Sequence, residues 1–204
     1  MTISSTSFSS KRRPRSILAA ALACFDQTGV DETTIAEICR KSGASTGSIY
    51  HFFDSKQGIV GALLVDGLRD NYEQTRQRLN KASGAQNGVR TIVESLIDWI
   101  TRNRAWARFI YATGTGSLTA KHREALRQLN DAYFEMVKAY FQPHVDAGEI
   151  AALPADCYAP LILGPVHEYA RRWLRGGVKT SLGQRKNVFS DAAWRVVGRS
   201  QTVG

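Results

Sequence analysis

The chain has 204 residues, 43% of them hydrophobic, and its 27 Lys and Arg against 18 Asp and Glu give a formal net charge of +9. This composition excludes an intrinsically disordered chain, and the length allows a core that needs neither disulfides nor metals. The positive balance favours a polyanionic partner, nucleic acid before a membrane surface.

The first fifteen residues are rich in Ser and Thr and end in the cluster Lys11-Arg12-Arg13-Pro14-Arg15. This pattern predicts a flexible basic arm over residues 1–15. From there on, apolar residues recur with the helical period, and no segment alternates long enough to predict a sheet. The fold class is therefore all-α, with about nine helices.

Four helices are predicted before residue 82. The first places Ile17, Ala21 and Phe25 on one stripe and ends before Gly29. A capping box, Thr34 with Glu37, opens the second. The predicted bounds are about 16–28, 35–42, 45–52 and 56–81.

The remaining helices follow Ser83–Gly88, which has the composition of a linker. The apolar stripes predict them near residues 89–100, 104–111, 126–140, 163–174 and 184–197. A loop is expected at 113–117.

Residues 34–53 have the spacing of a helix-turn-helix. Small Cys39 permits close approach of two short helices, Gly43 can adopt the left-handed turn conformation, and Ile49 anchors the second helix in the core. A helical hairpin without DNA-binding activity can show the same three positions. The wider sequence is needed to decide between them.

That wider sequence resembles the DNA-binding domain of the TetR family of bacterial transcription regulators. The resemblance rests on Ile17–Phe25, Gly29, Thr33–Ile38, Ser42–Phe53 and Ser55-Lys56-x-x-Ile59. It implies a cytoplasmic homodimer, most often a repressor, that binds a double-stranded DNA operator and is released by a small-molecule inducer. The implied domains are residues 16–62 for DNA binding and 63–204 for ligand binding and dimerisation.

The expected DNA contacts lie on and around the second short helix. Phosphate contacts implied by the resemblance are Thr34, Tyr50 and Lys56, and Thr34 and Lys56 also lie at helix starts, which attract anions. Their alternative roles are a pure cap, a core residue and a solvated charge. The groove-facing candidates are Ser45, Thr46, Gly47, Ser48, Tyr50 and His51, with Arg40 and Lys41 from the preceding helix.

No Arg, Lys, Asn or Gln lies between Ala44 and Phe53, so the side chains that best distinguish guanine and adenine are missing there. We therefore hypothesise that Arg12, Arg13 and Arg15 enter a flanking minor groove, as basic arms do in homeodomains. The alternative is a charge run that is only solvated.

The later helices are rich in aromatic residues, which predict either a plain core or an apolar ligand pocket with a few polar groups. The candidates are Trp106, Phe109, Tyr133, Val137, Tyr140 and His167. By the family resemblance, the last two long helices pair with their copies in a second subunit. Inducer binding is expected to move the fourth helix and so change the separation of the two recognition helices.

Other classes have weaker support. The sequence lacks a Gly-x-Ser-x-Gly elbow, a P-loop and a His-Glu-x-x-His motif, so we expect no enzyme, no catalytic residues and no cofactor. Neither the four His nor Cys24, Cys39 and Cys157 have metal or disulfide spacing, which predicts no metal and a reducing, cytoplasmic location. The longest apolar run is nine residues, well short of the roughly 20 that span a membrane. A transcription activator of the same fold remains an alternative, as do, more remotely, a helical enzyme or a basic interaction protein.

Overall fold

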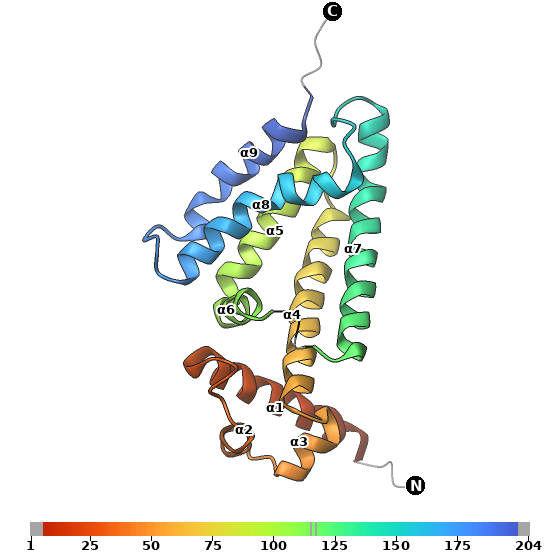
Figure 1. The fold of residues 1–204 in the computed structure, drawn as a ribbon. Coiled ribbons are helices and arrows are strands. Elements are labelled where there is room, and N and C mark those ends of the chain that lie inside the picture. Colours follow the sequence, from red (N-terminus) through yellow and green to blue (C-terminus); the bar gives the residue numbers. More distant parts are fainter. Residues whose placement is uncertain (1–5, 115, 117, 200–204) are drawn as a thin grey trace, which may run out of the picture. The chain divides into compact units, whose positions relative to one another are not determined.

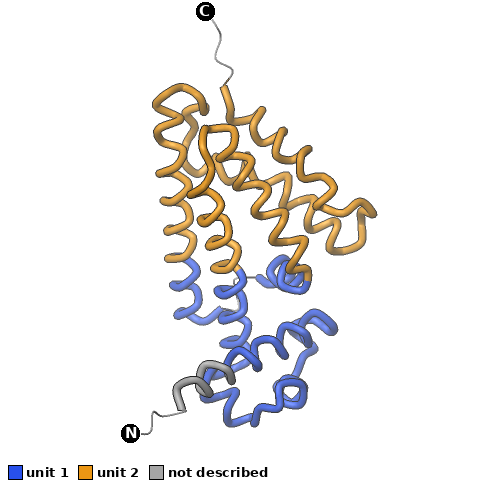
Figure 2. The backbone as a smooth tube through the Cα atoms, turned by 180° about the vertical axis from the view of Figure 1, so that it is seen from behind, with its two compact units in different colours: residues 1–67, 105–127 blue, residues 68–104, 128–204 orange. Residues whose placement is uncertain are grey.

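The computed structural model describes residues 6–114, 116 and 118–199, with side chains from Pro14 onward. Within these residues every named element is helical, and a β-bridge joins Ile150 to Gly198 (Figure 1). The predicted all-α class is confirmed. The chain divides into two compact units (Figure 2): unit 1 extends to Gly67 and includes Ala105–Arg127, and unit 2 comprises Leu68–Arg104 and the chain from Gln128 onward.

Unit 1 is built around fully buried aliphatic side chains that its short helices share. Ile17 of the first helix, Ile38 of the second, Ile49 of the third and Ile59 of the fourth are all at 0% exposure. The helices are α1 (Thr6–Thr28), α2 (Ile35–Ser42), α3 (Thr46–Phe53), the first part of α4 (Lys56–Leu79), almost all of α6 (Arg104–Ala112) and the first turns of α7 (Ala120–Asp146).

The first helix begins earlier than predicted. We expected residues 1–15 to form a mobile arm, yet the backbone is helical from Thr6, and Pro14 lies inside α1. The prediction began this helix at about Ser16, ten residues later. A proline such as Pro14 removes one backbone hydrogen bond and can bend a helix without ending it. Residues 1–5 of the predicted arm lie outside the described residues.

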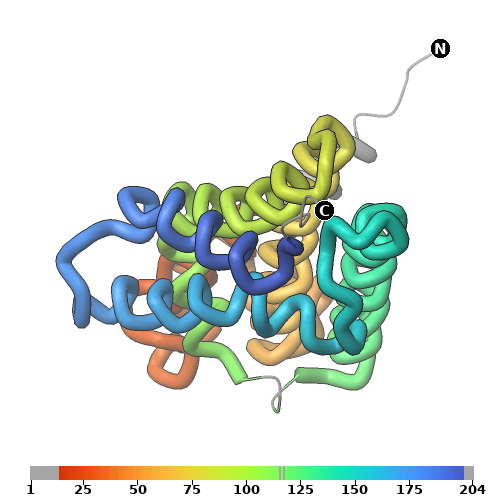
Figure 3. Tube along the Cα trace, turned by 90° about the horizontal axis from the view of Figure 1, so that it is seen from above, coloured from red at the N-terminus to blue at the C-terminus, as the bar shows by residue number. Residues whose placement is uncertain are grey.

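Unit 2 has its core where α5, α8 and α9 pack on one another, and Figures 1 and 3 show α8 and α9 running beside α5. Val89, Val93 and Ile97 of α5 are buried with Val166 of α8 and Val197 of α9. The helices of this unit are the rest of α4 and α7, α5 (Ala85–Arg102), α8 (Ala155–Leu174), the short 3-10 helix η2 (Leu182–Arg185) and α9 (Lys186–Val197).

The predicted linker Ser83–Gly88 is mostly helix. Gly84 precedes α5 with φ of 78°, and the helix starts at Ala85. Gly88 is buried against Tyr140, where an added Cβ would lie 2.1 Å from the ring. This glycine therefore serves close packing and not chain flexibility, which composition alone cannot distinguish.

Helices α7 and α8 are longer than their apolar stripes predicted. Their first turns carry exposed residues such as Lys121 and Asp156, so the periodic signal begins late. Pro160 and Pro165 both lie inside α8, where each removes one backbone hydrogen bond.

Candidate nucleic-acid interface and ligand region

Helices α2 and α3 form the predicted helix-turn-helix. Gly43 ends α2 in the left-handed region with φ of 68°, and its N–H donates to the Cys39 carbonyl. The Cys39 thiol lies 3.6 Å from the Thr46 hydroxyl, so the two helices approach closely at this small residue. Ile49 of α3 is fully buried. All three roles expected of these positions are confirmed.

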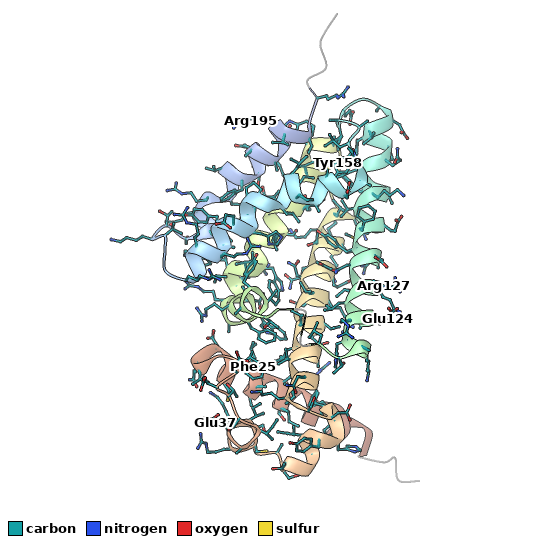
Figure 4. All side chains as sticks on the ribbon, viewed as in Figure 1. Phe25, Glu37, Glu124, Arg127, Tyr158 and Arg195 are labelled. Atoms are coloured by element: carbon teal, nitrogen blue, oxygen red, sulfur yellow. The ribbon has the colours of Figure 1, made fainter. Side chains whose placement is uncertain are left out.

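A reciprocal cap fixes the start of α2. The Glu37 N–H donates to Thr34 Oγ1 over 3.2 Å, and the Thr34 N–H donates to Glu37 Oε2 over 2.8 Å (Figure 4 labels Glu37). The bonds from Thr34 lower the pKa of the Glu37 carboxyl. The predicted capping box is confirmed, and it places a carboxylate beside the hydroxyl that we expected to meet a phosphate.

The outer face of α3 presents short side chains to solvent. Ser45 caps the helix by accepting from the Ser48 N–H, and the two hydroxyls lie 3.0 Å apart. Tyr50 is 51% exposed, in contrast to its alternative assignment as a core residue. Ser48 is half-buried. The other predicted groove-facing residues are exposed, namely Ser45, Thr46, Gly47, Tyr50 and His51.

Two further predicted DNA contacts are basic side chains of α2. Arg40 and Lys41 are exposed in its last turn, and the Lys41 ammonium donates to Gln27 Oε1 over 3.3 Å. A cavity of about 330 Å³ lies beside them, between α1 and α2.

Lys56 has a structural role that the sequence did not predict. Its ammonium donates to three backbone carbonyls of the loop before α2, at 2.9 Å from Val30, 3.0 Å from Asp31 and 3.0 Å from Thr33. These three bonds use the three donors of the ammonium. A phosphate contact through this side chain would replace one of them, whereas the first backbone N–H groups of α4 have no acceptor within the helix.

Of the hypothesised arm residues, Arg15 is exposed on α1, and the side chains of Arg12 and Arg13 lie outside those that the structure describes. Their contact with a minor groove stays a prediction.

The six ligand candidates fall in different units. Trp106 and Phe109 belong to unit 1, where Phe109 stacks on Phe25 at 5.7 Å between ring centroids (Figure 4 labels Phe25). Trp106 packs against Gly67 of α4. These two contacts give both aromatic residues a packing role in unit 1.

The other four candidates belong to unit 2 and are half-buried: Tyr133, Val137, Tyr140 and His167. Tyr133 stacks on Tyr72 at 4.1 Å between centroids, and burial raises its pKa. Burial also lowers the pKa of His167 to about 4. The two cavities with defined linings lie in unit 1 and include none of the six candidates.

Sequence reasoning missed three buried polar residues of unit 2. Asn71 and Thr75 of α4 and Ser95 of α5 are 5%, 1% and 1% exposed. Each lies on an apolar stripe of its helix. Asn71 and Thr75 share a stripe with Leu79, and Ser95 shares one with Ile92 and Trp99. A polar residue on such a stripe was the signal that would have found them.

The described residues contain no group of three or more potential metal-ligating side chains, and none of their helices is long and apolar enough to cross a membrane.

Two family sequence models match the chain. One is described as "Bacterial regulatory proteins, tetR family" and matches residues 17–63, and the other, "Tetracyclin repressor-like, C-terminal domain", matches residues 83–197. The second model alone covers more than half of the chain.

The curated relatives include HTH-type transcriptional regulators named BetI. The protein of Paraburkholderia xenovorans (strain LB400) is 31% identical over 87 residues, which are 42% of this chain and 45% of that protein. The protein of Cronobacter sakazakii (strain ATCC BAA-894) is 33% identical over 88 residues, 42% and 44% of the two chains. The chain thus spans less than half the length of these relatives.

Solved structures share the fold over nearly the whole chain. PfmR, a TetR family transcriptional regulator from Thermus thermophilus, has a TM-score of 0.74 and 19% identity and covers 91% of this chain and 99% of its own. The regulator FadR from Bacillus subtilis, solved in complex with stearoyl-CoA, has a TM-score of 0.75 and 16% identity, with coverage of 88% and 96%. At these identities the likeness shows the fold.

Proposed function

The chain belongs to the TetR family of bacterial regulatory proteins, and from this premise we propose that it is a DNA-binding transcription regulator, a repressor released from its operator by a small-molecule inducer. One observation carries the proposal. α3 is anchored by a fully buried Ile49 while its opposite face is exposed and lined by small polar residues, Tyr50 and His51. A helix held in this way fits the major groove of double-stranded DNA.

Contacts to the DNA divide into positioning and reading. Tyr50 and the helix starts at Thr34 and Lys56 contact phosphates and set the register. Bases are read by Ser45, Thr46, Ser48 and His51, with help from Arg40 and Lys41. Because hydroxyls dominate this face and Thr46 adds one methyl group, contact with a thymine methyl and DNA shape carry much of the specificity.

A two-fold operator requires a second copy of the chain. We assign dimerisation to α8 and α9, whose outer faces leave large apolar side chains in solvent. Leu161 of α8 is 39% exposed, and Val188 and Val196 of α9 are 59% and 51% exposed. Residues 16–62 then form the DNA-binding domain, and residues 63–204 the domain for ligand binding and dimerisation.

Release works through α4, which begins in unit 1 at Lys56 and ends in unit 2 at Leu79. An inducer held in unit 2 displaces this helix and changes the distance between the two recognition helices. Half-sites on one face of the DNA are about 34 to 36 Å apart, so a shift of a few ångströms loses register.

The test is selection of genomic DNA fragments by the full chain, followed by gel shifts of the selected fragment and of random DNA of equal length. We expect the selected fragment to bind at least about a thousandfold more tightly, the range of specific regulators. Equal affinity for both DNAs contradicts the proposal.

Two variants test whether the selected fragment binds at the proposed interface. Replacing exposed Tyr50 with Ala removes a phosphate contact and is expected to weaken binding of the selected fragment by about tenfold, which corresponds to about 1.4 kcal/mol. Replacing Phe134, an exposed aromatic residue of α7, with Ala is the control and leaves binding unchanged. Transcription of the gene beside the selected fragment then distinguishes a repressor from an activator.

A further inference from the structure

A buried polar cluster lies inside unit 2, formed by Asn71 and Thr75 of α4 and Ser95 of α5. Asn71 and Thr75 are one turn apart on α4. Trp99, one turn after Ser95 on α5, donates its indole N–H to Asp70, the neighbour of Asn71, over 2.7 Å. The two helices are therefore in contact beside Asn71, one turn along α5 from Ser95.

Two side-chain atoms of the polar cluster lack hydrogen-bond partners among the described residues. The Thr75 hydroxyl donates to the Asn71 carbonyl over 3.0 Å. Asn71 Nδ2 and Ser95 Oγ are buried and have no hydrogen-bond partner among the described residues. Buried polar atoms are nearly always paired, because an unpaired one keeps the full cost of its desolvation. An amide and a hydroxyl at core positions thus point to a partner other than this chain's own side chains.

Long side chains separate α4 from the helices beside it. α5, α8 and α9 pack closely on one another, whereas α4 is joined to its neighbours by contacts such as Arg78 to Asp98 at 2.9 Å and Tyr72 to Asn130 at 2.9 Å. The stacked rings of Tyr72 and Tyr133 lie on the α7 side of α4. This part of unit 2 therefore combines unpaired polar atoms with aromatic surface.

Three half-buried titratable side chains of unit 2 are uncharged at neutral pH. Burial raises the pKa of Tyr72 and of Tyr133, and it lowers the pKa of His167 to about 4. Charged side chains of α4 and α5 form ion pairs at partly exposed positions, Arg78 with Asp98 and Arg90 with Asp191. The exposed Asp70 carboxylate accepts from the Trp99 indole. The polar cluster itself holds no charged group, and an unpaired buried charge is very costly.

We propose that Asn71 and Ser95 are the hydrogen-bonding contacts of the inducer, and that the inducer is a neutral aromatic or aliphatic molecule bearing a carbonyl or hydroxyl oxygen. This inference rests on the proposed function, since it assigns the ligand class of the same regulatory site. The Asn71 amide donates to the ligand oxygen, and the Ser95 hydroxyl donates or accepts. Carboxylates, acyl thioesters of charged carriers and ammonium compounds are excluded from this site.

The test compares three probes with the same ring: acetophenone, benzoate and benzylamine, each at millimolar concentration with the full chain. The readout is the melting temperature, which needs no operator. Acetophenone is expected to raise it by about 2 to 4 °C through mass action on the folded state. Benzoate and benzylamine are expected to leave it unchanged. An equal or larger shift with either charged probe overturns the proposal, as does no shift with acetophenone.

Substitutions connect the shift to the two residues. Asn71→Leu and Ser95→Ala remove the unpaired groups, so without a probe the melting temperature stays equal or rises, and the acetophenone shift disappears. Ser190→Ala is the matched control, because Ser190 is also fully buried but its hydroxyl donates to the Lys186 carbonyl over 3.0 Å. This control is expected to lower the melting temperature and to keep the acetophenone shift.

The variants also separate two kinds of failure. If Asn71→Leu and Ser95→Ala lower the melting temperature as Ser190→Ala does, the two groups are structural and the inference is wrong. If the thermal shifts behave as expected while acetophenone does not release the selected DNA fragment, the site exists and the regulatory function is what fails. If the chain selects no fragment, the proposed function fails and the thermal result still stands.

Discussion

At the scale of single residues, the glycine of α3 has no packing reason to be a glycine. Gly47 is exposed, and a Cβ there would meet only Ser45 Oγ at 3.9 Å. A glycine inside a helix costs roughly 0.5 to 1 kcal/mol relative to alanine. The fold therefore tolerates a loss of stability at a position that we place against DNA, where a missing side chain lets the backbone approach the bases.

Gly47→Ala should consequently act with opposite sign on folding and on binding. We expect the free energy of unfolding to rise by about 0.5 to 1 kcal/mol in urea titrations, while affinity for the selected fragment falls. Gly88→Ala is the contrast, since its Cβ would lie 2.1 Å from the Tyr140 ring and should destabilise by about 1 to 3 kcal/mol. Unchanged DNA affinity in Gly47→Ala would argue against close backbone approach.

Lys56 gives a second prediction at this scale. Lys56→Met keeps the apolar stem and removes the ammonium, so the carbonyls of Val30, Asp31 and Thr33 lose their common donor. Unfolding in urea should show a loss of about 1 to 3 kcal/mol. The exposed Lys81→Met should change stability by no more than about 0.5 kcal/mol. A loss of DNA affinity without a loss of stability would instead make Lys56 a phosphate contact only.

The local residue roles could be predicted from sequence, and the distant ones could not. Gly43, Ile49 and the Thr34 cap follow from spacing within a few turns. The partners of Lys56 lie 23 to 26 residues earlier in the chain, a distance over which no periodic pattern carries information. The unpaired atoms of Asn71 and Ser95 likewise depend on which helices face each other.

At the scale of secondary-structure elements, helix identity was predicted more reliably than helix ends. The apolar stripe of α1 predicted its buried face, but the predicted start at about Ser16 was wrong, since the helix begins at Thr6. In α7 and α8 the first turns are solvent-exposed and therefore lack apolar periodicity. Helix ends are decided by caps and solvent contacts, which leave weaker signals than burial.

The basic residues at the start of α1 can be tested without disturbing the helix stripe. Replacing Arg12, Arg13 and Arg15 together with Gln should weaken operator binding and lower the salt slope of log K by about 0.9 for each phosphate that is no longer neutralised. Gel shifts over a range of salt concentrations measure both quantities. An unchanged affinity and slope would show that these residues are only solvated.

Helix α8 should make stability depend on pH through His167. Burial lowers its pKa in the folded state to about 4, below the 6.5 of the unfolded chain. Between these two pKa values the unfolded state binds more protons than the folded state. The contribution of His167 to stability is therefore fully present above pH 6.5 and is lost as the pH drops toward 4. The loss reaches up to about 3 kcal/mol.

Chemical denaturation at pH 7, 6, 5 and 4.5 measures this dependence. His167→Gln, which does not titrate, should reduce the slope of the stability curve above about pH 4. The Arg108 guanidinium lowers the pKa of Asp26 by hydrogen bonding to its carboxylate. That stability is present above the unfolded pKa of about 3.9 and is lost as the pH falls below it, so the two windows are separable. His122, whose pKa burial also lowers, contributes in the same direction as His167.

At the scale of the whole molecule, the positive charge is distributed unevenly. Residues 1–16 carry four basic and no acidic residues, whereas residues 17–60, which contain the helix-turn-helix, carry three basic and five acidic residues. Residues 61–204 carry 20 basic and 13 acidic residues. Net charge therefore indicated a nucleic-acid partner, as expected for this family, but it does not locate the interface. We place the interface at the helix-turn-helix because of the motif spacing.

Self-association is the prediction that concerns the molecule as a whole. Val188→Glu combined with Val196→Glu places charges on the exposed apolar face of α9 and should weaken the dimer by at least about tenfold in Kd. Phe134→Glu on α7 is the control and should leave it intact. Sedimentation velocity over a concentration series distinguishes the two, and a wild-type chain that is monomeric at micromolar concentration would refute the dimer.

Two glycines in the first half of α4 restrict which residue pairs relatives of this chain can have. A Cβ at Gly61 would lie 2.3 Å from the imidazole of His122, and one at Gly67 would lie 2.6 Å from the indole of Trp106. Each glycine is therefore matched to the bulk of one specific neighbour. Across relatives of this chain, positions 61 and 122 should covary, as should 67 and 106, with a larger residue on α4 accompanied by a smaller one opposite.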